Sequence, residues 1–195
     1  MIVIYGVTFF IILVFQRSII AKSFYDSIKN LFFALYTFIE FLFFLLIYWQ
    51  NIKEKTFRIF VIATFSSFVI FQVVYFFSVE NNKIDNIPVG IETLIIYTYI
   101  FYFFYDRFKN IDKQYIYNHY CFWISIGIML YLGGSFFFYI LGNHIPPKQL
   151  ENYWYFTYIV EIVKNILFAI ALIVYSHHNS KEKIPNQNLP YLDFN

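Results

Sequence analysis

The chain has 195 residues, of which 60% are hydrophobic and only 13% are charged. A soluble domain has about 25% charged residues, and no stretch of this chain is both polar enough and long enough to form a second, water-soluble domain. The formal net charge is +2 and the basic residues are scattered over short loops, which excludes a nucleic-acid footprint. The composition predicts an all-α, polytopic transmembrane helix bundle, with residues 1–175 as one domain.

The first half of the chain contains three apolar runs that read as transmembrane helices. Residues 1–20 form the first, and they lack the basic start and the cleavage site of a signal peptide. Residues 31–49 form the second, with Glu40 at its middle, and residues 59–79 form the third, with Gln72 inside it. Six spans are expected in all, or five if the first does not cross the bilayer.

The second half contains three further runs. Residues 87–105 form the fourth span, with Glu92 near its start, and residues 121–142 form the fifth, which carries no charge. Residues 153–175 form the sixth. Residues 176–195 are polar and contain two prolines, which predicts an irregular cytoplasmic tail.

The sixth span carries ionisable side chains close to its centre. Thr157, Tyr158, Glu161, Lys164 and Asn165 occupy helix positions i, i+1, i+4, i+7 and i+8, which places them on one stripe. Ionisable groups at such depth are expensive and usually face a partner or a wet cavity. The stripe is therefore expected to face away from lipid.

The other polar groups lie at a similar level in their spans. Counted from the outer end of each span at about 1.5 Å per residue, Glu40 lies roughly 14 Å deep, Glu92 roughly 8 Å, Gln72 roughly 10 Å, Glu161 roughly 12 Å and Lys164 roughly 16 Å. The hydrocarbon core is about 30 Å thick. The depths predict one shared cluster between the second, third, fourth and sixth spans, in the outer half of the bilayer.

The cluster has two interpretations. Glu161 and Lys164 can neutralise each other at i, i+3, Glu40 and Glu92 can be protonated, and hydrogen bonds between such groups hold ordinary bundles together. Three carboxylates for one ammonium are nevertheless more acid than pairing requires. The alternative is a site for a cation, a proton or a small polar ligand, with the candidate residues Glu40, Glu92, Glu161, Lys164, Gln72 and Asn165.

The fifth span carries small residues on one face. Gly127 and Gly134 are seven residues apart, with Gly133 beside them, and small residues let helix backbones approach closely. We expect a helix-packing seam within the chain rather than a dimer interface. Phe (28) and Tyr (19) are so abundant that no single tyrosine indicates a site.

No pattern in the sequence indicates enzyme chemistry. The single cysteine, Cys121, excludes an intrachain disulfide and a cysteine-cluster metal site. The four histidines fall in predicted loops or in the tail, and H-E-x-x-H, G-x-S-x-G and P-loop motifs are absent. We therefore expect no enzyme activity, no cofactor and no metal.

Lys and Arg in the predicted loops favour an orientation with both termini in the cytoplasm. The inner side holds Lys53, Lys55, Arg58, Arg107, Lys109, Lys113, Lys181 and Lys183. The outer side holds fewer: Arg17, Lys22, Lys29, Lys83 and Lys148. Lys22, Asp26 and Lys29 are read as a loop between the first two spans.

Several stretches resemble a group of small polytopic membrane proteins from bacteria. These are CFWISIGIMLYLGGSFFFYIL (121–141) with IVKNILFAIAL (162–172), and upstream YTFIEFLFFLLIYW (36–49) with GIETLIIYTYIFYFFY (90–105). The resemblance covers roughly residues 31–175. It implies a module similar to the membrane-sensing halves of two-component receptors without the kinase, located in the bacterial inner membrane, and it supplies no catalytic residues.

The first functional hypothesis is thus a sensory or accessory signalling module, with the polar cluster as its ligand or proton site. A small structural subunit of a larger membrane complex is the second, and a proton-coupled transporter of small solutes is the third. The expected partners are the lipid bilayer and another membrane protein.

Overall fold

The computed structural model describes residues 2–18, 22–78, 86–109, 116–142 and 147–182. These residues form six α-helices and one short 3-10 helix, with no strand among them. The elements are α1 (Ile2–Ser18), α2 (Lys22–Asn51), α3 (Lys55–Ser78), α4 (Asn86–Lys109), η1 (Ile116–Asn118), α5 (Tyr120–Gly142) and α6 (Pro147–Glu182). The predicted fold class, a polytopic helix bundle, is confirmed.

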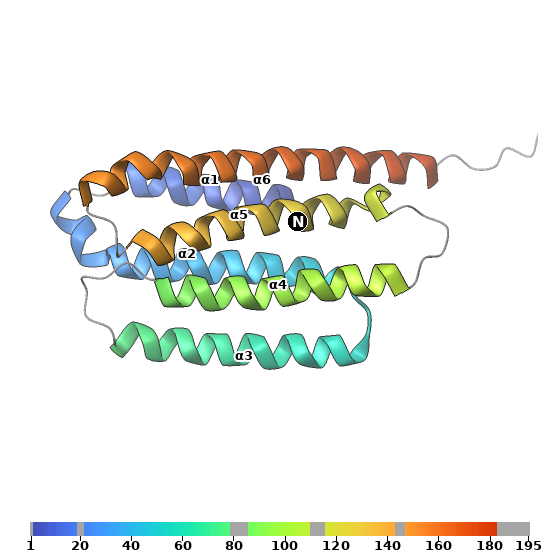
Figure 1. Cartoon of the computed structure of the whole chain (residues 1–195), viewed down its shortest axis with the longest axis horizontal. Helices are drawn as coiled ribbons and strands as arrows, with labels where there is room; N and C mark the ends of the chain where they lie inside the picture. Colours follow the sequence, from blue (N-terminus) through green and yellow to red (C-terminus); the bar gives the residue numbers. More distant parts are fainter. Residues whose placement is uncertain (1, 19–21, 79–85, 110–115, 143–146, 183–195) are drawn as a thin grey trace, which may run out of the picture.

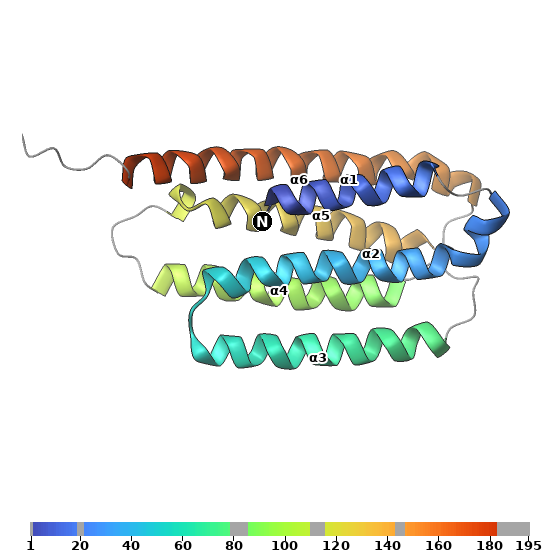
Figure 2. The same cartoon turned by 180° about the vertical axis from the view of Figure 1, so that it is seen from behind.

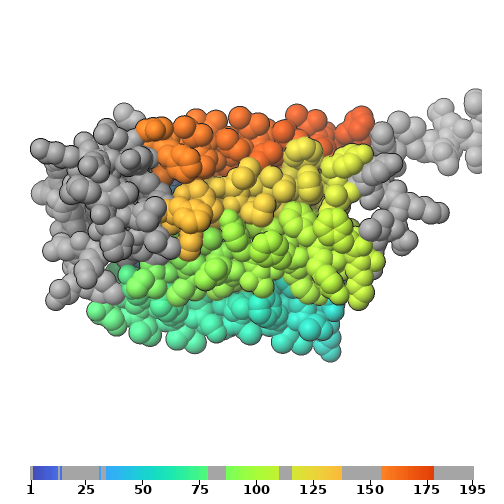
Figure 3. Space-filling model, in the orientation of Figure 1, coloured from blue at the N-terminus to red at the C-terminus, as the bar shows by residue number. Residues whose placement is uncertain are grey.

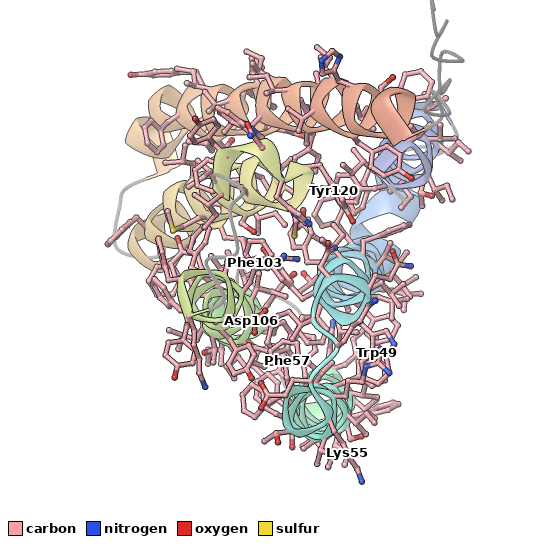
Figure 4. The ribbon with its side chains drawn as sticks, turned by 90° about the vertical axis from the view of Figure 1, so that its right-hand side faces the viewer. Trp49, Lys55, Phe57, Phe103, Asp106 and Tyr120 are labelled. Atoms are coloured by element: carbon pink, nitrogen blue, oxygen red, sulfur yellow. The ribbon has the colours of Figure 1, made fainter. Side chains whose placement is uncertain are left out.

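The helices run side by side along the long axis of the molecule, with α6 and α3 at opposite flanks (Figure 1). α5 packs most extensively along α6, and contacts continue from α5 to α4, from α4 to α2, and from both α2 and α4 to α3. From behind, α1 lies beside α6 (Figure 2). One face of the molecule shows α6, α5, α4 and α3 in succession (Figure 3). Viewed from the end, α6 crosses above the other helices at an angle (Figure 4).

Within the described residues, five helices are long and apolar enough to cross a membrane. Their apolar stretches are Ala34–Asn51, Lys55–Ser78, Ile87–Lys109, Tyr120–Phe137 and Tyr155–His177. Large apolar side chains cover the outside of the bundle, among them Phe77 of α3, Phe137 of α5 and Ile173 of α6. An apolar surface of this extent suits lipid and not water. The protein is a multi-pass membrane protein.

The first predicted span, residues 1–20, is not among these five. α1, Ile2–Ser18, has 17 residues, which at about 1.5 Å per residue is about 26 Å, slightly less than a hydrocarbon core about 30 Å thick. α1 accompanies only one half of the bundle (Figure 1). The described residues thus form six α-helices, five of which are long and apolar enough to span a membrane, and whether the first segment crosses stays a prediction.

Two helices extend beyond their predicted spans. α2 begins at Lys22, so the residues read as a loop before the second span are helical. α6 runs from Pro147 to Glu182, whereas the sixth span was predicted as 153–175 and the residues after it as an irregular tail. Apolar composition shows where a helix contacts lipid, and it does not show where the helix ends. The start of α6 at Pro147 is consistent with the preference of proline for the first turn of a helix. Residues 183–195 of the predicted tail lie outside the described part of the chain.

The core of the bundle is aromatic where α2 and α4 meet. Phe44 and Tyr48 of α2 and Tyr99 and Phe103 of α4 are fully buried. The Tyr48 hydroxyl donates to Ser125 Oγ of α5 at 3.1 Å, which joins the third helix to this core. The packing fixes the rotation of α2 and α4 about their axes, and it thereby decides which of their polar residues face inward.

Candidate functional site: a buried lysine with two glutamates and two tyrosines

Three helices each turn one ionisable side chain into the bundle. Glu40 of α2, Glu92 of α4 and Lys164 of α6 are 4%, 1% and 1% exposed. Each of the three lies three or four residues from a buried apolar residue of its own helix. This spacing puts the ionisable side chain on the inward face of the helix. The buried neighbours on these stripes are Phe44 and Tyr48 on α2, Ile96 and Tyr99 on α4, and Phe168 and Ala171 on α6.

Lys164 stands at the centre of the polar groups. Its Nζ lies 3.9 Å from Glu40 Oε1 and donates a hydrogen bond to the Tyr5 hydroxyl at 2.8 Å. The same nitrogen lies 3.7 Å from the centroid of the Tyr131 ring and 5.2 Å from that of Tyr5. Aromatic faces attract cations, most strongly where water is excluded. The ammonium thus has a carboxylate, a hydroxyl and two rings in place of water.

Both oxygens of Glu40 receive a hydrogen bond. The Tyr5 hydroxyl of α1 donates to Oε1 at 3.0 Å, and the Tyr131 hydroxyl of α5 donates to Oε2 at 3.3 Å. The Tyr36 hydroxyl, one turn away on α2, lies 3.4 Å from the Tyr131 hydroxyl. A buried ion pair is tolerated when its remaining lone pairs and protons are satisfied, and this pair meets that condition. We call Lys164, Glu40, Tyr5, Tyr131 and Glu92 the lysine cluster.

Glu92 is the least satisfied member of the lysine cluster. It is buried, it interacts electrostatically with Glu40 and Lys164, and its Oε1 has no hydrogen-bond partner within the described residues. A buried carboxylate without a donor is far less stable than one with donors. The single ammonium is already engaged by Glu40, so Glu92 is the acid in excess.

The structure divides the predicted stripe on α6. Lys164 is buried and Glu161, one turn before it, is half-buried and interacts electrostatically with Lys164 and Glu40. Tyr158 and Asn165 are exposed on the outer surface of the bundle. Each residue turns a helix by about 100°, so the positions next to Thr157 and Lys164 fall at the edge of a stripe that is too wide to be buried whole. Asn165 is therefore not part of the inward site.

Gln72 does not join the predicted cluster and instead connects α3 to α2. It is buried on α3, and its Nε2 donates to the Ala34 carbonyl oxygen of α2 at 2.7 Å. Ala34 precedes Glu40 by six residues, which is about 9 Å along the helix. The structure thus draws α1 and α5 into the cluster and leaves α3 outside it.

No pattern in the sequence singles out Tyr5 and Tyr131. The chain has 19 tyrosines, so the presence of a tyrosine at one position does not indicate a site. A depth argument applied to hydroxyl groups would have found Tyr131, which lies eleven residues into α5 and therefore near mid-membrane. No comparable signal points to Tyr5, because its role depends on where α1 docks.

The three glycines of α5 lie at close helix contacts. A Cβ atom added at Gly134 would lie 2.7 Å from Val160 Cγ1 of α6, and one at Gly127 would lie 3.2 Å from Phe168 Cε1. Gly133 faces α4, where an added Cβ would meet the Tyr97 hydroxyl at 2.5 Å. Gly127 and Gly134 thus bring α5 against the helix that carries Lys164.

The chemistry available in the lysine cluster is acid–base chemistry. Its groups are one ammonium, two buried carboxyl groups and two phenols, with Glu161 at the edge. In the described part of the chain, no three His, Cys, Asp or Glu side chains are grouped to hold a metal ion. Cys121 is buried on α5. Comparison of the chain with protein-family models, with curated proteins and with solved structures found no match.

Proposed function

We propose that this protein is a sensory or accessory signalling module of the bacterial inner membrane, and that its lysine cluster binds a proton. The observation that carries the proposal is Glu92 Oε1, buried and without a hydrogen-bond donor beside a Glu40–Lys164 pair that is already satisfied. Ionisable groups in membrane segments mark ion paths, proton sites and ligand sites. The resemblance described above supports a sensory or accessory role.

A proton fits this site better than a small polar ligand. Lys164 and Glu92 are each 1% exposed, and the rings of Tyr5 and Tyr131 occupy the space around the ammonium. A ligand of several atoms would have to displace one of these side chains. A proton needs no space, and Glu92 offers it an oxygen with no other partner among the described residues.

α6 is suited to carry the signal to the end of the bundle. It is one helix from Pro147 to Glu182, and it continues for five residues past the apolar stretch that ends at His177. Glu182 lies about 27 Å from Lys164 along the helix axis. Loss of the proton from Glu92 adds a negative charge near Lys164, and a shift of α6 in response would move its polar end. With both termini in the cytoplasm, this end faces a partner there.

The test compares Glu92→Gln with the wild-type protein in lipid nanodiscs. If the folded state holds a proton on Glu92 that the unfolded state releases, the stability of the wild type falls as pH rises. Gln is neutral at every pH and similar in shape, so Glu92→Gln should keep the low-pH stability and lose most of this pH dependence. Thermal unfolding followed by circular dichroism, at a series of pH values, measures both.

The matched control is Glu54→Gln. Glu54 is exposed immediately before α3 and accepts a hydrogen bond from Tyr102. This variant should retain the pH dependence of the wild type. An unchanged pH dependence in Glu92→Gln would contradict the proposed proton site. Loss of the pH dependence combined with wild-type signalling in cells that carry Glu92→Gln would contradict the sensory role of this proton.

A further inference from the structure

The outward face of α6 carries a regular seam of exposed side chains. Its positions are Tyr155, Tyr158, Ile162, Asn165, Ala169 and Leu172, and all six are exposed. Their spacing alternates between three and four residues, which is the spacing by which two helices pack knobs into holes. The buried stripe of the same helix, which contains Lys164 and Phe168, has the same period and lies about 100° away around the helix axis, because Lys164 and Phe168 directly precede Asn165 and Ala169. α6 thus has two packing faces, of which the bundle uses one.

Asn165 makes this seam unlike the other lipid-facing surfaces. It directly follows Lys164, so it lies at the same depth near the middle of the span, and its amide is exposed. A polar side chain in the hydrocarbon core normally faces another protein segment and forms hydrogen bonds there. On α3, the other flanking helix, the exposed positions at this level are apolar, as at Ile70, or carry the hydroxyl groups of Ser66 and Ser67. A serine hydroxyl can hydrogen-bond to a carbonyl oxygen of its own helix, so these positions need no partner helix.

We infer that a second copy of this chain packs against the seam, α6 against α6, with the two Asn165 side chains hydrogen-bonded across a twofold axis. The Asn165 carboxamide donates hydrogen bonds through Nδ2 and accepts them through Oδ1. Two identical asparagine side chains can therefore hydrogen-bond to each other. A twofold interface brings the same surface of both copies together. A single asparagine at a core position of a helix seam also fixes the register of the pair.

The seam is shaped for a close contact around Asn165. Ala169, one turn after it, is small, and small residues let transmembrane helices approach. Ile162, one turn before it, is 57% exposed and supplies apolar packing on the other side. Two parallel copies of α6 place these three residues opposite their own counterparts. The inference is independent of the proton site, because Asn165 is exposed on the surface of α6 and Glu92 of α4 is buried inside the bundle.

Cysteine cross-linking in native membranes tests the geometry. In a Cys121→Ser background, Ile162→Cys and Ala169→Cys should each form a disulfide-linked dimer of this chain on mild oxidation. Ile70→Cys on α3 is the matched control, because Ile70 is 65% exposed at a similar depth, and it should remain monomeric. Equal cross-linking at Ile70 would overturn the inference, and so would cross-linking of Ile162→Cys to a different protein.

The amide is tested by Asn165→Leu and Asn165→Gln in lipid vesicles, with dimerisation measured by energy transfer between labelled copies. Removal of the amide bonds should weaken the dimer about threefold to thirtyfold, and Gln should retain part of the affinity. The helix content and thermal stability of both variants should match the wild type, because Asn165 has no role inside the bundle. A wild type that stays monomeric, or an Asn165→Leu dimer of unchanged affinity, would overturn the proposal.

Discussion

The two flanking helices, α6 and α3, are attached to the bundle by different means. α6 is held through a charged side chain, Lys164, which three other helices satisfy with Glu40, Tyr5 and Tyr131. α3 buries only Phe57, Val61, Phe68 and Gln72, and its buried polar attachments are neutral. Its charged contact, Arg58 over the Trp49 ring of α2 at 5.1 Å, involves an exposed side chain near the start of the helix.

The difference follows from the cost of burying charge. An ammonium must be surrounded on all sides before it leaves water, so Lys164 requires helices that enclose it. A neutral amide needs one acceptor, and Gln72 finds it in the carbonyl oxygen of Ala34. The hydroxyls of Thr64 and Tyr99 form a second neutral link between α3 and α4. A helix can therefore lie at the edge of the bundle with neutral contacts, whereas a charged contact specifies its neighbours.

The largest expected effect comes from separating the charges that hold α6. Glu40→Gln leaves the ammonium of Lys164 without its carboxylate, and breaking a buried pair from one side costs about 3–5 kcal/mol. The free energy of unfolding in detergent micelles, followed by circular dichroism, should fall by this amount.

The control for this variant removes both charges. Glu40→Gln combined with Lys164→Met leaves no unpaired ion, so the double variant should recover most of the lost stability. If Glu40→Gln alone is as stable as the wild type, Lys164 is not held by charge and the contrast with α3 disappears.

A smaller effect is expected from widening the contact between α5 and α6. Gly134→Ala places a methyl group 2.7 Å from Cγ1 of Val160, a β-branched side chain with little freedom to move. Overpacking costs about 1–3 kcal/mol, which outweighs the roughly 0.5–1 kcal/mol that alanine gains over glycine in a helix. Thermal unfolding should show a net loss.

Gly90→Ala is the matched substitution on α4. Its added Cβ would lie 3.5 Å from Phe136 Cε2, an ordinary contact distance. This variant should be as stable as the wild type or slightly more stable. A loss in Gly90→Ala equal to that in Gly134→Ala would show that the α5–α6 contact is no tighter than its surroundings.

The smallest effect is expected at α3. Gln72→Met removes a hydrogen bond to Ala34, and such bonds average about 0.6 kcal/mol in membrane bundles. The substitution also removes Oε1, which is buried and has no partner among the described residues. The free energy of unfolding should therefore change by less than about 1 kcal/mol. A loss as large as that of Glu40→Gln would show that the neutral attachment is equivalent to the charged one.

The helices themselves could be predicted from the sequence because apolar runs of about 20 residues leave little choice of structure. The meeting of Glu40, Glu92 and Lys164 could also be anticipated, since depth along a helix is fixed by the residue count. The ends of α2 and α6 could not be predicted, because the helical turns that extend beyond the bilayer are as polar in composition as loops.

The remaining members of the lysine cluster depend on rotation and docking, which the residue count does not give. Asn165 and Lys164 are neighbours in sequence, yet Lys164 is buried in the bundle and Asn165 is exposed on its surface. Tyr5 joins the cluster only because α1 lies against α2 and α6, as its ring contacts with Phe43 and Phe168 show. Contacts of this kind are decided by packing across helices and are not encoded in any one segment.

The order of the charged residues along the chain has a consequence for biosynthesis. A ribosome releases Glu40 with α2 and Lys164 only with α6, so the acid of the nascent protein stays unmatched while α3, α4 and α5 are inserted. During that interval the half-made bundle differs chemically from the finished one. Membrane proteases or insertases that respond to an intramembrane charge can thereby tell a chain that lacks α6 from one that contains it.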